Sequence, residues 1–188
     1  MAASIFQGEL VRLVSEDPEI FAKNFSRWGR DSEYHRLLDN DPARLVSVRT
    51  AQKWFESDLD RDAFEGCFFT IQTLDTAQSI GFIGMGGISW NHREAWVGIG
   101  IGERGYWGKG YGTDAMRLIL RYAFTELNLQ RVSLGVFEYN PRAIHSYEKA
   151  GFVHEGQTRK QVLREGKRWD EVQMGVLRSE WLEWEKGG

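Results

Sequence analysis

The sequence predicts one domain of the α+β class, in which helices flank a central mixed sheet that is mostly antiparallel. Two observations predict this class. Short strand patterns joined by tight turns occur early and late in the chain, and one strand–helix–strand unit lies between them. The length of 188 residues supports a single domain over 1–188, large enough to bury a sizeable core.

The first third of the chain predicts one strand and three helices. Residues 9–14 alternate apolar and polar side chains, as an opening strand does. Residues 15–28 begin with residue types that cap helices, so they predict a helix. Residues 31–40 and 50–59 predict two further short helices.

Three strands follow in the central part of the chain. Residues 66–74, 79–90 and 95–102 have the composition of strands. The stretches 75–78 and 91–94 are the turns between them, so we expect antiparallel hairpins here.

The clearest helix is predicted over 113–127. Its apolar residues recur on one face, and a polar stripe of Asp114, Arg117, Arg121 and Thr125 runs opposite. This spacing predicts a helix with one buried face and one face in solvent.

The remaining elements carry local signals. Residues 131–138 predict a strand, and 140–151 predict a helix with both ends marked, by Asn140 as N-cap and a closing glycine. Residues 152–177 predict two or three strands, and 179–186 predict a short terminal helix.

Composition excludes several classes of function. A net charge of −3 and a pI near 5.9 do not suggest a nucleic-acid binder, which usually carries a basic face. The single Cys67 excludes an internal disulfide and fits a reducing compartment, and the four histidines show no metal-ligand spacing. Without a signal sequence or an apolar run of about 18 residues, we expect a cytoplasmic protein with no membrane partner and no metal.

A run of glycines precedes the 113–127 helix. Residues 102–118 read GERGYWGKGYGTDAMRL, which excludes a P-loop because Glu103 stands where its first glycine belongs. A dinucleotide fingerprint fits loosely from Gly110, but no strand runs directly into that glycine. Two interpretations remain: a tight strand–helix turn with glycines for steric reasons, or backbone N–H groups at a helix start that bind an anion.

Two motifs in order support the second interpretation. YWGKGYGTDA, with NPRAIHSYEKAGF some thirty residues on, resembles the GNAT superfamily of acetyl-CoA-dependent N-acetyltransferases. The likeness is nearest to the bacterial-type RimJ/RimL branch, which acetylates ribosomal-protein N-termini and many other amines, and it extends from about Phe68 to Leu177. It implies a GNAT-like acyltransferase fold whose strands splay around a coenzyme A (CoA) site.

The resemblance also implies the cofactor contacts. The CoA pyrophosphate would lie on the backbone of Gly108, Lys109, Gly110, Tyr111, Gly112 and Thr113. The pantetheine arm would pair with the strand that ends at Ile99, Gly100, Ile101 and Gly102, beside Asn140 and Tyr147. Trp107 departs from the family pattern, which has Gln or Arg at its position, and so removes one cationic contact.

Tyr147 is the predicted general acid for the departing thiolate. It lies seven residues after Asn140, so the two share a helix face about 10 Å apart. Asn140 is alternatively only a helix cap, and Tyr147 only a packed core residue.

The general base is not defined by the pattern. Many relatives carry a Glu in the strand before the glycines, at the position where this chain has Trp96. Glu94 lies on the same face of that strand as Trp96, where it either orders a water molecule or is simply solvated. At pH 7 an α-amine of pKa about 8 is roughly one-tenth neutral, whereas a lysine-like amine of pKa about 10.4 is almost wholly charged. A site without a dedicated carboxylate therefore favours a peptide N-terminus.

The sequence thus predicts acetyl transfer from acetyl-CoA to a primary amine by direct attack in a ternary complex. A ribosomal-type protein N-terminus is favoured, a small amine or polyamine is the alternative, and a non-catalytic acyl-CoA-binding module is the alternative of another class. Cys67 as an acetylated nucleophile is disfavoured because it lies in a buried strand pattern. The resemblance also implies that a homodimer can form. Five aromatic residues either line the amine pocket or belong to the core: Trp28, Tyr34, Trp54, Phe55 and Trp90.

Overall fold

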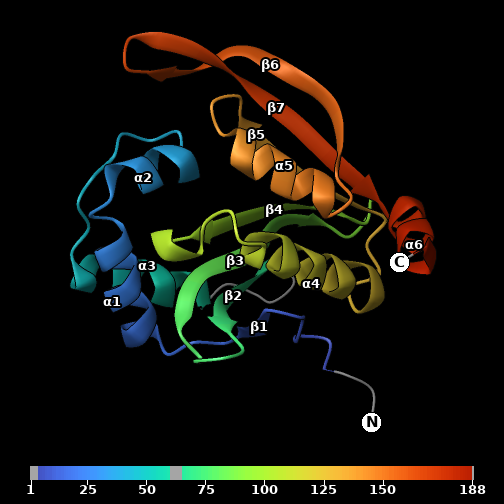
Figure 1. The fold of residues 1–188 in the computed structure, drawn as a ribbon, viewed down its shortest axis with the longest axis horizontal. Helices are drawn as coiled ribbons and strands as arrows, with labels where there is room; N and C mark the ends of the chain where they lie inside the picture. The colour runs from blue at the N-terminus through green and yellow to red at the C-terminus, as the bar shows by residue number, and fades with distance from the viewer. Residues whose placement is uncertain (1–3, 60–64, 188) are drawn as a thin grey trace.

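A computed structural model describes residues 4–59 and 65–187 and shows a seven-stranded mixed sheet with helices on both faces (Figure 1). The strands are β1 (Val11–Val14), β2 (Gly66–Thr73), β3 (Ser79–Ser89), β4 (Glu94–Ile101), β5 (Arg131–Phe137), β6 (Val153–Arg164) and β7 (Lys167–Leu177). They lie in the order β1-β2-β3-β4-β5-β7-β6, and every neighbouring pair is antiparallel except β4 and β5, which are parallel. The α+β class and the mostly antiparallel mixed sheet are confirmed.

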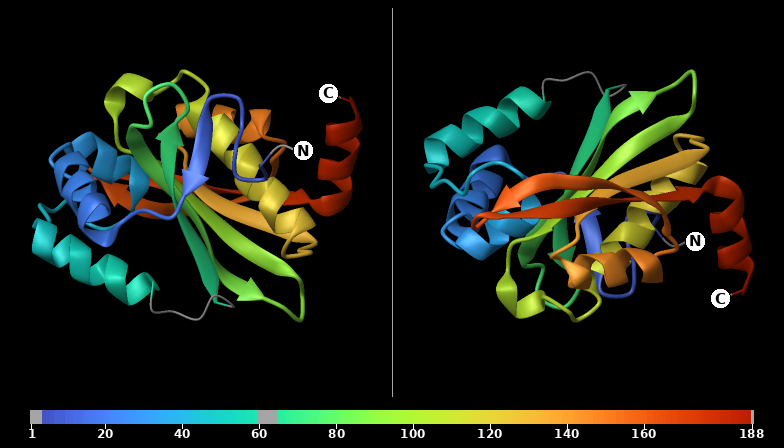
Figure 2. Two further views of the ribbon diagram at one scale, coloured as in Figure 1. Left: turned by 90° about the horizontal axis from the view of Figure 1, so that it is seen from below. Right: turned by 90° about the horizontal axis from the view of Figure 1, so that it is seen from above.

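The helices also follow the predicted order. They are α1 (Pro18–Trp28), α2 (Ser32–Leu38), α3 (Val48–Leu59), the 3-10 turn η1 (Arg104–Tyr106), α4 (Tyr111–Thr125), α5 (Pro141–Lys149) and α6 (Arg178–Gly187). Figure 2 shows α1, α2 and α3 grouped at one end of the molecule and α6 at the other. The turn η1 has no counterpart in the sequence prediction, and 152–177 forms two strands.

The two faces of the sheet are covered by different kinds of side chain. On one face, α4 buries its apolar stripe against strand residues such as Val97, Val132 and Leu134. On the other face, α1, α2 and α3 pack an aromatic cluster over β2 and β3, formed by Phe21, Trp28, Tyr34, Phe55, Phe68 and Phe82.

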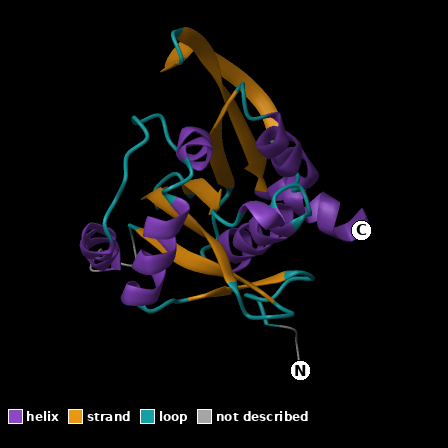
Figure 3. Cartoon of the chain, turned by 60° about the vertical axis from the view of Figure 1, so that its left-hand side comes forward, coloured by secondary structure: helices purple, strands orange, loops and turns teal. Residues whose placement is uncertain are grey.

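β4 and β5 separate soon after they meet. Their pairing joins Glu94, Ala95 and Trp96 to Arg131, Val132 and Ser133, and no further pair joins them toward Ile101. A gap therefore opens in the middle of the sheet, next to α5 and α2. The long β6–β7 hairpin extends beyond the rest of the sheet toward α2 (Figures 1 and 3).

The prediction that Asp114 belongs to a solvent-facing polar stripe of α4 is wrong. Its side chain is buried, and its carboxylate accepts the backbone N–H groups of Glu9, Leu10 and Val11 at 3.3, 2.8 and 3.0 Å. The charge is compensated by these three donors and by the start of the helix, where the backbone dipole favours an anion. Asp114 thus attaches the N-terminal segment to α4 instead of facing solvent.

Candidate functional site

A first cavity begins at the gap between β4 and β5. It has a volume of about 360 Å³ and lies among α2, the end of β4, the start of α4, and α5. Ten predicted cofactor residues line it: Ile99, Gly100, Ile101, Trp107, Gly108, Gly110, Gly112, Thr113, Asn140 and Tyr147. The two motifs that lie apart in the sequence therefore meet at one cavity.

The start of α4 leaves its backbone donors uncapped. Asp17, Asp31 and Asn140 accept the first N–H groups of α1, α2 and α5, but Gly110 at the N-cap of α4 makes no side-chain cap bond. The first N–H groups of a helix have no partner within it, so those of α4 are available to an anion in the cavity.

Glycine is required in this turn by its backbone angles. Gly108 and Gly110 have φ of +71° and +92°, which residues with a Cβ rarely adopt. Both line the cavity. The turn is therefore tight for steric reasons and also exposes backbone to the cavity, so the two interpretations of the glycine run apply together. A CoA pyrophosphate fits such a cradle.

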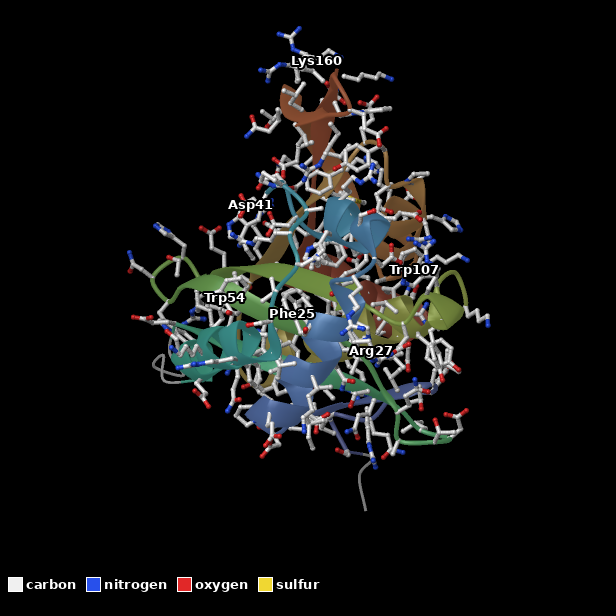
Figure 4. The ribbon with its side chains drawn as sticks, turned by 90° about the vertical axis from the view of Figure 1, so that its left-hand side faces the viewer. Phe25, Arg27, Asp41, Trp54, Trp107 and Lys160 are labelled. Carbon is white, nitrogen blue, oxygen red and sulfur yellow. The ribbon has the colours of Figure 1, made fainter. Side chains whose placement is uncertain are left out.

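Trp107 holds two cations beside the cavity. Its indole N–H donates to the carbonyl of Ile101 at 2.6 Å, and the guanidinium carbons of Arg104 and Arg142 lie 4.6 and 4.1 Å from its ring centroid. Arg104 is neutralised by Asp31, whereas no hydrogen bond or ion pair of Arg142 joins it to a described residue. Arg142 thus places a guanidinium against the ring of Trp107, at whose position the family pattern has Gln or Arg. Figure 4 shows Trp107 near α2.

Three predicted cofactor residues lie outside the cavity lining. Gly102 lies beneath Trp28, where an added Cβ would come within 2.1 Å of the indole ring. Tyr111 packs edge-on against Tyr106, with ring centroids 4.9 Å apart. The Lys109 side chain is exposed. Packing explains Gly102 and Tyr111 in this structure, and any cofactor contact they make stays a prediction.

Asn140 and Tyr147 face the same cavity from α5. Asn140 is buried and its Oδ1 accepts the N–H of Ala143 at 3.2 Å, so the predicted cap is present. Tyr147 also packs against the main core, and burial raises the pKa of its phenol to about 12. The hydroxyl therefore stays protonated at neutral pH and can donate to an acceptor in the cavity.

A second cavity, of about 350 Å³, opens on the sheet face opposite α4. Its lining is Leu38, Asp39, Asn40, Trp96, Gly135, Phe137, Glu171 and Gln173. Trp96 is 52% exposed, and Gly135 leaves room for Glu171, whose Oε1 would be 2.8 Å from a Cβ at that position. Leu38 lines both cavities, so they adjoin at the end of α2. Two carboxylates and no Lys or Arg give this lining a negative charge.

The predicted base and four of the five predicted amine-pocket residues lie outside both cavity linings. Glu94 is absent from the lining of both cavities and begins β4 beside Ser89 and Arg131. Trp28 and Phe55 are core residues, and Trp54 and Trp90 are exposed away from both linings. Of the aromatic candidates only Tyr34 lines a cavity, the first one.

From the sequence, the amine is expected to approach between the first two predicted helices and the stretch 164–171, and the second cavity is lined from the end of 31–40 and by Glu171. No single residue of that lining was predicted to bind the amine, and Trp96 stood out only as a departure from the family pattern. The alternation of β7 assigns Glu171 and Gln173 to one face, but only the pairing of β7 with β5 brings them opposite Phe137 and Gly135.

Cys67 does not suit nucleophilic chemistry. Burial raises the pKa of its thiol, so the reactive thiolate is rare at neutral pH. It lies outside the linings of both cavities. Across 4–59 and 65–187, no group of three or more His, Cys, Asp and Glu side chains is arranged to hold a metal ion.

Comparison with protein families decides the class of the molecule. The model of the family described as "Acetyltransferase (GNAT) domain" matches residues 9–153. The chain belongs to the GNAT acetyltransferase family. This GNAT domain is an acetyl-CoA-dependent N-acetyltransferase, as the uncapped helix start and the cavity beside it lead one to expect. No helix in the described part of the chain is both long and apolar enough to cross a membrane.

Individual relatives agree with the family. An SPbeta prophage-derived uncharacterized N-acetyltransferase of Bacillus subtilis is 28% identical over 191 residues, covering 96% of this chain and 97% of the relative. Spermidine N(1)-acetyltransferase of Vibrio cholerae is 36% identical over 103 residues, covering 55% of this chain and 59% of that protein. The crystal structure of spermidine N-acetyltransferase from Vibrio cholerae in complex with CoA and spermine matches with a TM-score of 0.77 at 24% identity, over 92% of this chain and 96% of the other, which shows a shared fold.

Proposed function

We propose that this GNAT domain transfers the acetyl group of acetyl-CoA to one primary amine of a polyamine such as spermidine, by direct attack in a ternary complex. The observation that carries the proposal is the second cavity, with its two carboxylates and the half-exposed face of Trp96. The spermidine acetyltransferases among its relatives support the same substrate class. This changes the preference drawn from the sequence, which favoured a peptide N-terminus.

The charge of the second cavity suits a molecule with several amines. A carboxylate that attracts an ammonium ion also stabilises its proton, so it binds the charged nitrogen but does not release the neutral one. A polyamine avoids this conflict because one nitrogen can bind Glu171 and Asp39 while another, further along the chain, reacts. Trp96 offers a ring face to the same cation. A monoamine has no second nitrogen for the carboxylates.

On the donor side, we assign the pyrophosphate to the uncapped start of α4, with Arg142 as an additional cation. Bound acetyl-CoA supplies the thioester that the amine attacks. Tyr147 donates its hydroxyl proton toward the departing sulfur. With a pKa of about 12 against about 8.5 for a thiol, Tyr147 stabilises the thiolate by a hydrogen bond more readily than by complete proton transfer.

A panel of acceptor amines tests this proposal. Thiol release from acetyl-CoA is measured with spermidine, spermine, heptylamine and a set of N-terminal peptides. We expect kcat/KM for the polyamines to exceed that of heptylamine and of the peptides by at least about tenfold, since only they engage both carboxylates. Equal or better peptide rates would restore the N-terminal acceptor.

The variant Glu171→Gln tests whether the preference for polyamines depends on the second cavity. It keeps the side-chain shape but removes one charge, so we expect KM for spermidine to rise about tenfold while KM for acetyl-CoA and the heptylamine rate stay unchanged. The exposed residue Glu138, outside the second cavity lining, gives the matched control as Glu138→Gln. A preference that survives Glu171→Gln would remove the cavity from the proposal.

A further inference from the structure

Tyr34 is a buried tyrosine whose hydroxyl has no partner. It lies in the first turn of α2, its side chain is 3% exposed, and its ring packs within the aromatic cluster of α1 and α3. Its hydroxyl makes no hydrogen bond to any described residue. Buried hydroxyls are normally paired because an unpaired one loses its bonds to water without compensation, so this group requires an explanation.

The hydroxyl points toward β4 at the first cavity. Tyr34 lines that cavity together with Ile99, Gly100 and Ile101. A Cβ built on Gly100 would lie 2.9 Å from the Tyr34 hydroxyl and 2.9 Å from Leu38 Cδ1. Gly100 therefore makes room for the approach of α2, and any larger residue there would displace the tyrosine.

Two other tyrosines near the site have hydroxyls with a partner. The Tyr139 hydroxyl donates to the carbonyl of Arg36 at 2.8 Å, and the Tyr106 hydroxyl donates to Gln78 Oε1 at 2.9 Å. Of these three tyrosines, only Tyr34 has a hydroxyl without a hydrogen bond to a described residue. Its hydroxyl faces β4 at Gly100, beside the gap between β4 and β5.

We propose that the Tyr34 hydroxyl donates a hydrogen bond to a carbonyl oxygen of the acyl-pantetheine arm where that arm passes Gly100. The inference rests on the proposed function in one respect, that the first cavity holds this arm. It adds a binding residue from α2, outside both sequence motifs. Acetyl-CoA would then be contacted by α2 as well as by β4 and α5.

The chemistry of the group suits a donor role. Burial raises the pKa of Tyr34, so the phenol stays neutral and carries its proton throughout the physiological range. The arm of acetyl-CoA carries two amide carbonyls and one thioester carbonyl, each of which accepts such a bond. α2 also ends at Leu38, which lines both cavities, so a bond to Tyr34 would fix the helix that borders the acceptor side.

The variant Tyr34→Phe tests the inference with two readouts of opposite sign. It keeps the ring and its packing and removes only the oxygen. Because the oxygen is unpaired without ligand, we expect the apo protein to keep its melting temperature or gain about 2 °C. Because the bond to the arm is lost, we expect the dissociation constant for acetyl-CoA, measured by calorimetry, to rise about tenfold.

The control is Tyr139→Phe, which removes a hydroxyl with a known partner. That variant should melt at a lower temperature than the wild type, unlike Tyr34→Phe. Comparing acetyl-CoA with CoA then locates the acceptor. An equal loss for both ligands assigns the bond to a pantetheine amide, and a loss for acetyl-CoA alone assigns it to the thioester; both support the inference.

Two results would overturn it. Unchanged affinity for both ligands in Tyr34→Phe, with normal binding by the wild type, would remove Tyr34 and leave the proposed function intact. A lower apo melting temperature would show that the hydroxyl has a structural partner. Failure of the proposed function looks different, because wild-type protein would then acetylate no polyamine whatever the Tyr34 result.

Discussion

Tyr147 illustrates how burial decides what one side chain can do. Its phenol lies against the core and also lines the first cavity, and burial raises its pKa to about 12. We expect Tyr147→Phe to slow turnover at least tenfold and leave acetyl-CoA affinity nearly unchanged, because the hydroxyl is needed when charge builds on sulfur. Steady-state rates and calorimetry on the same preparation measure both. A full-rate variant would show that another group stabilises the departing thiolate.

The same pKa predicts a pH profile. The acid form of Tyr147 persists up to about pH 12, so it imposes no loss of activity on the alkaline side below about pH 10. The reacting amine must be neutral, and its neutral fraction rises about tenfold per pH unit below its pKa of about 10.4. We therefore expect kcat/KM for spermidine to rise from pH 7 to 9 without a maximum. A bell-shaped profile with a falling limb in that range would identify a different acid.

At the scale of an element, the start of α4 couples stability to binding with opposite signs. Gly112 lies in the first turn and lines the cavity, and an added Cβ would meet its nearest neighbours at ordinary contact distances of 3.7 Å or more. We expect Gly112→Ala to stabilise the apo protein by up to about 1 kcal/mol, because alanine favours helix, and to weaken acetyl-CoA binding through its methyl.

Thermal melts and calorimetry check both parts of this prediction. Gly105→Ala is the control, since a Cβ there meets nothing within 4 Å and Gly105 lies outside the cavity lining. If Gly112→Ala bound acetyl-CoA as tightly as the wild type, the pyrophosphate would not lie on this turn.

The other element-scale prediction concerns Asp114. Asp114→Asn keeps an oxygen for Leu10 and Val11 but sets an amide N–H₂ against the N–H of Glu9, and it removes a charge-assisted bond. We expect the free energy of unfolding to fall by about 1–3 kcal/mol. Urea titration measures it, and a midpoint equal to that of the wild type would mean that Asp114 contributes nothing.

At the scale of the whole molecule, the β6–β7 hairpin is tied to the segment after α2. Arg164 donates to the carbonyl of Asp41 at 2.8 Å and also to that of Asp39, and Arg36 pairs with Glu165. Figure 4 shows Asp41 below the part of the hairpin that carries Lys160 of β6. Asp39 lines the second cavity, so these bonds hold one wall of the proposed acceptor site.

Removing the tie should affect one substrate only. We expect Arg164→Gln to raise KM for spermidine several-fold with KM for acetyl-CoA unchanged, because only the acceptor wall loosens. The exposed Arg159, on the same hairpin, supplies the control as Arg159→Gln. Equal changes in both KM values would indicate general destabilisation.

What the sequence could predict follows the range of the interactions involved. The helix of Asn140 and the turn of Gly110 have local causes, a cap and a positive φ, and both were predictable. Asp114 was misassigned because its partners lie more than a hundred residues away. Arg142 over Trp107 and Glu171 in the second cavity depend likewise on elements that meet only in the folded chain.

The first cavity extends from the start of α4 to α2, the second opens on the sheet face opposite α4, and Leu38 is the one residue that their linings share. With acetyl-CoA in the first and the amine in the second, as proposed, each product has its own way out. The acetylated amine and free CoA can then leave in either order. We expect double-reciprocal plots of initial rate against substrate concentration to intersect. We also expect each product to compete only with the substrate that binds in the same cavity.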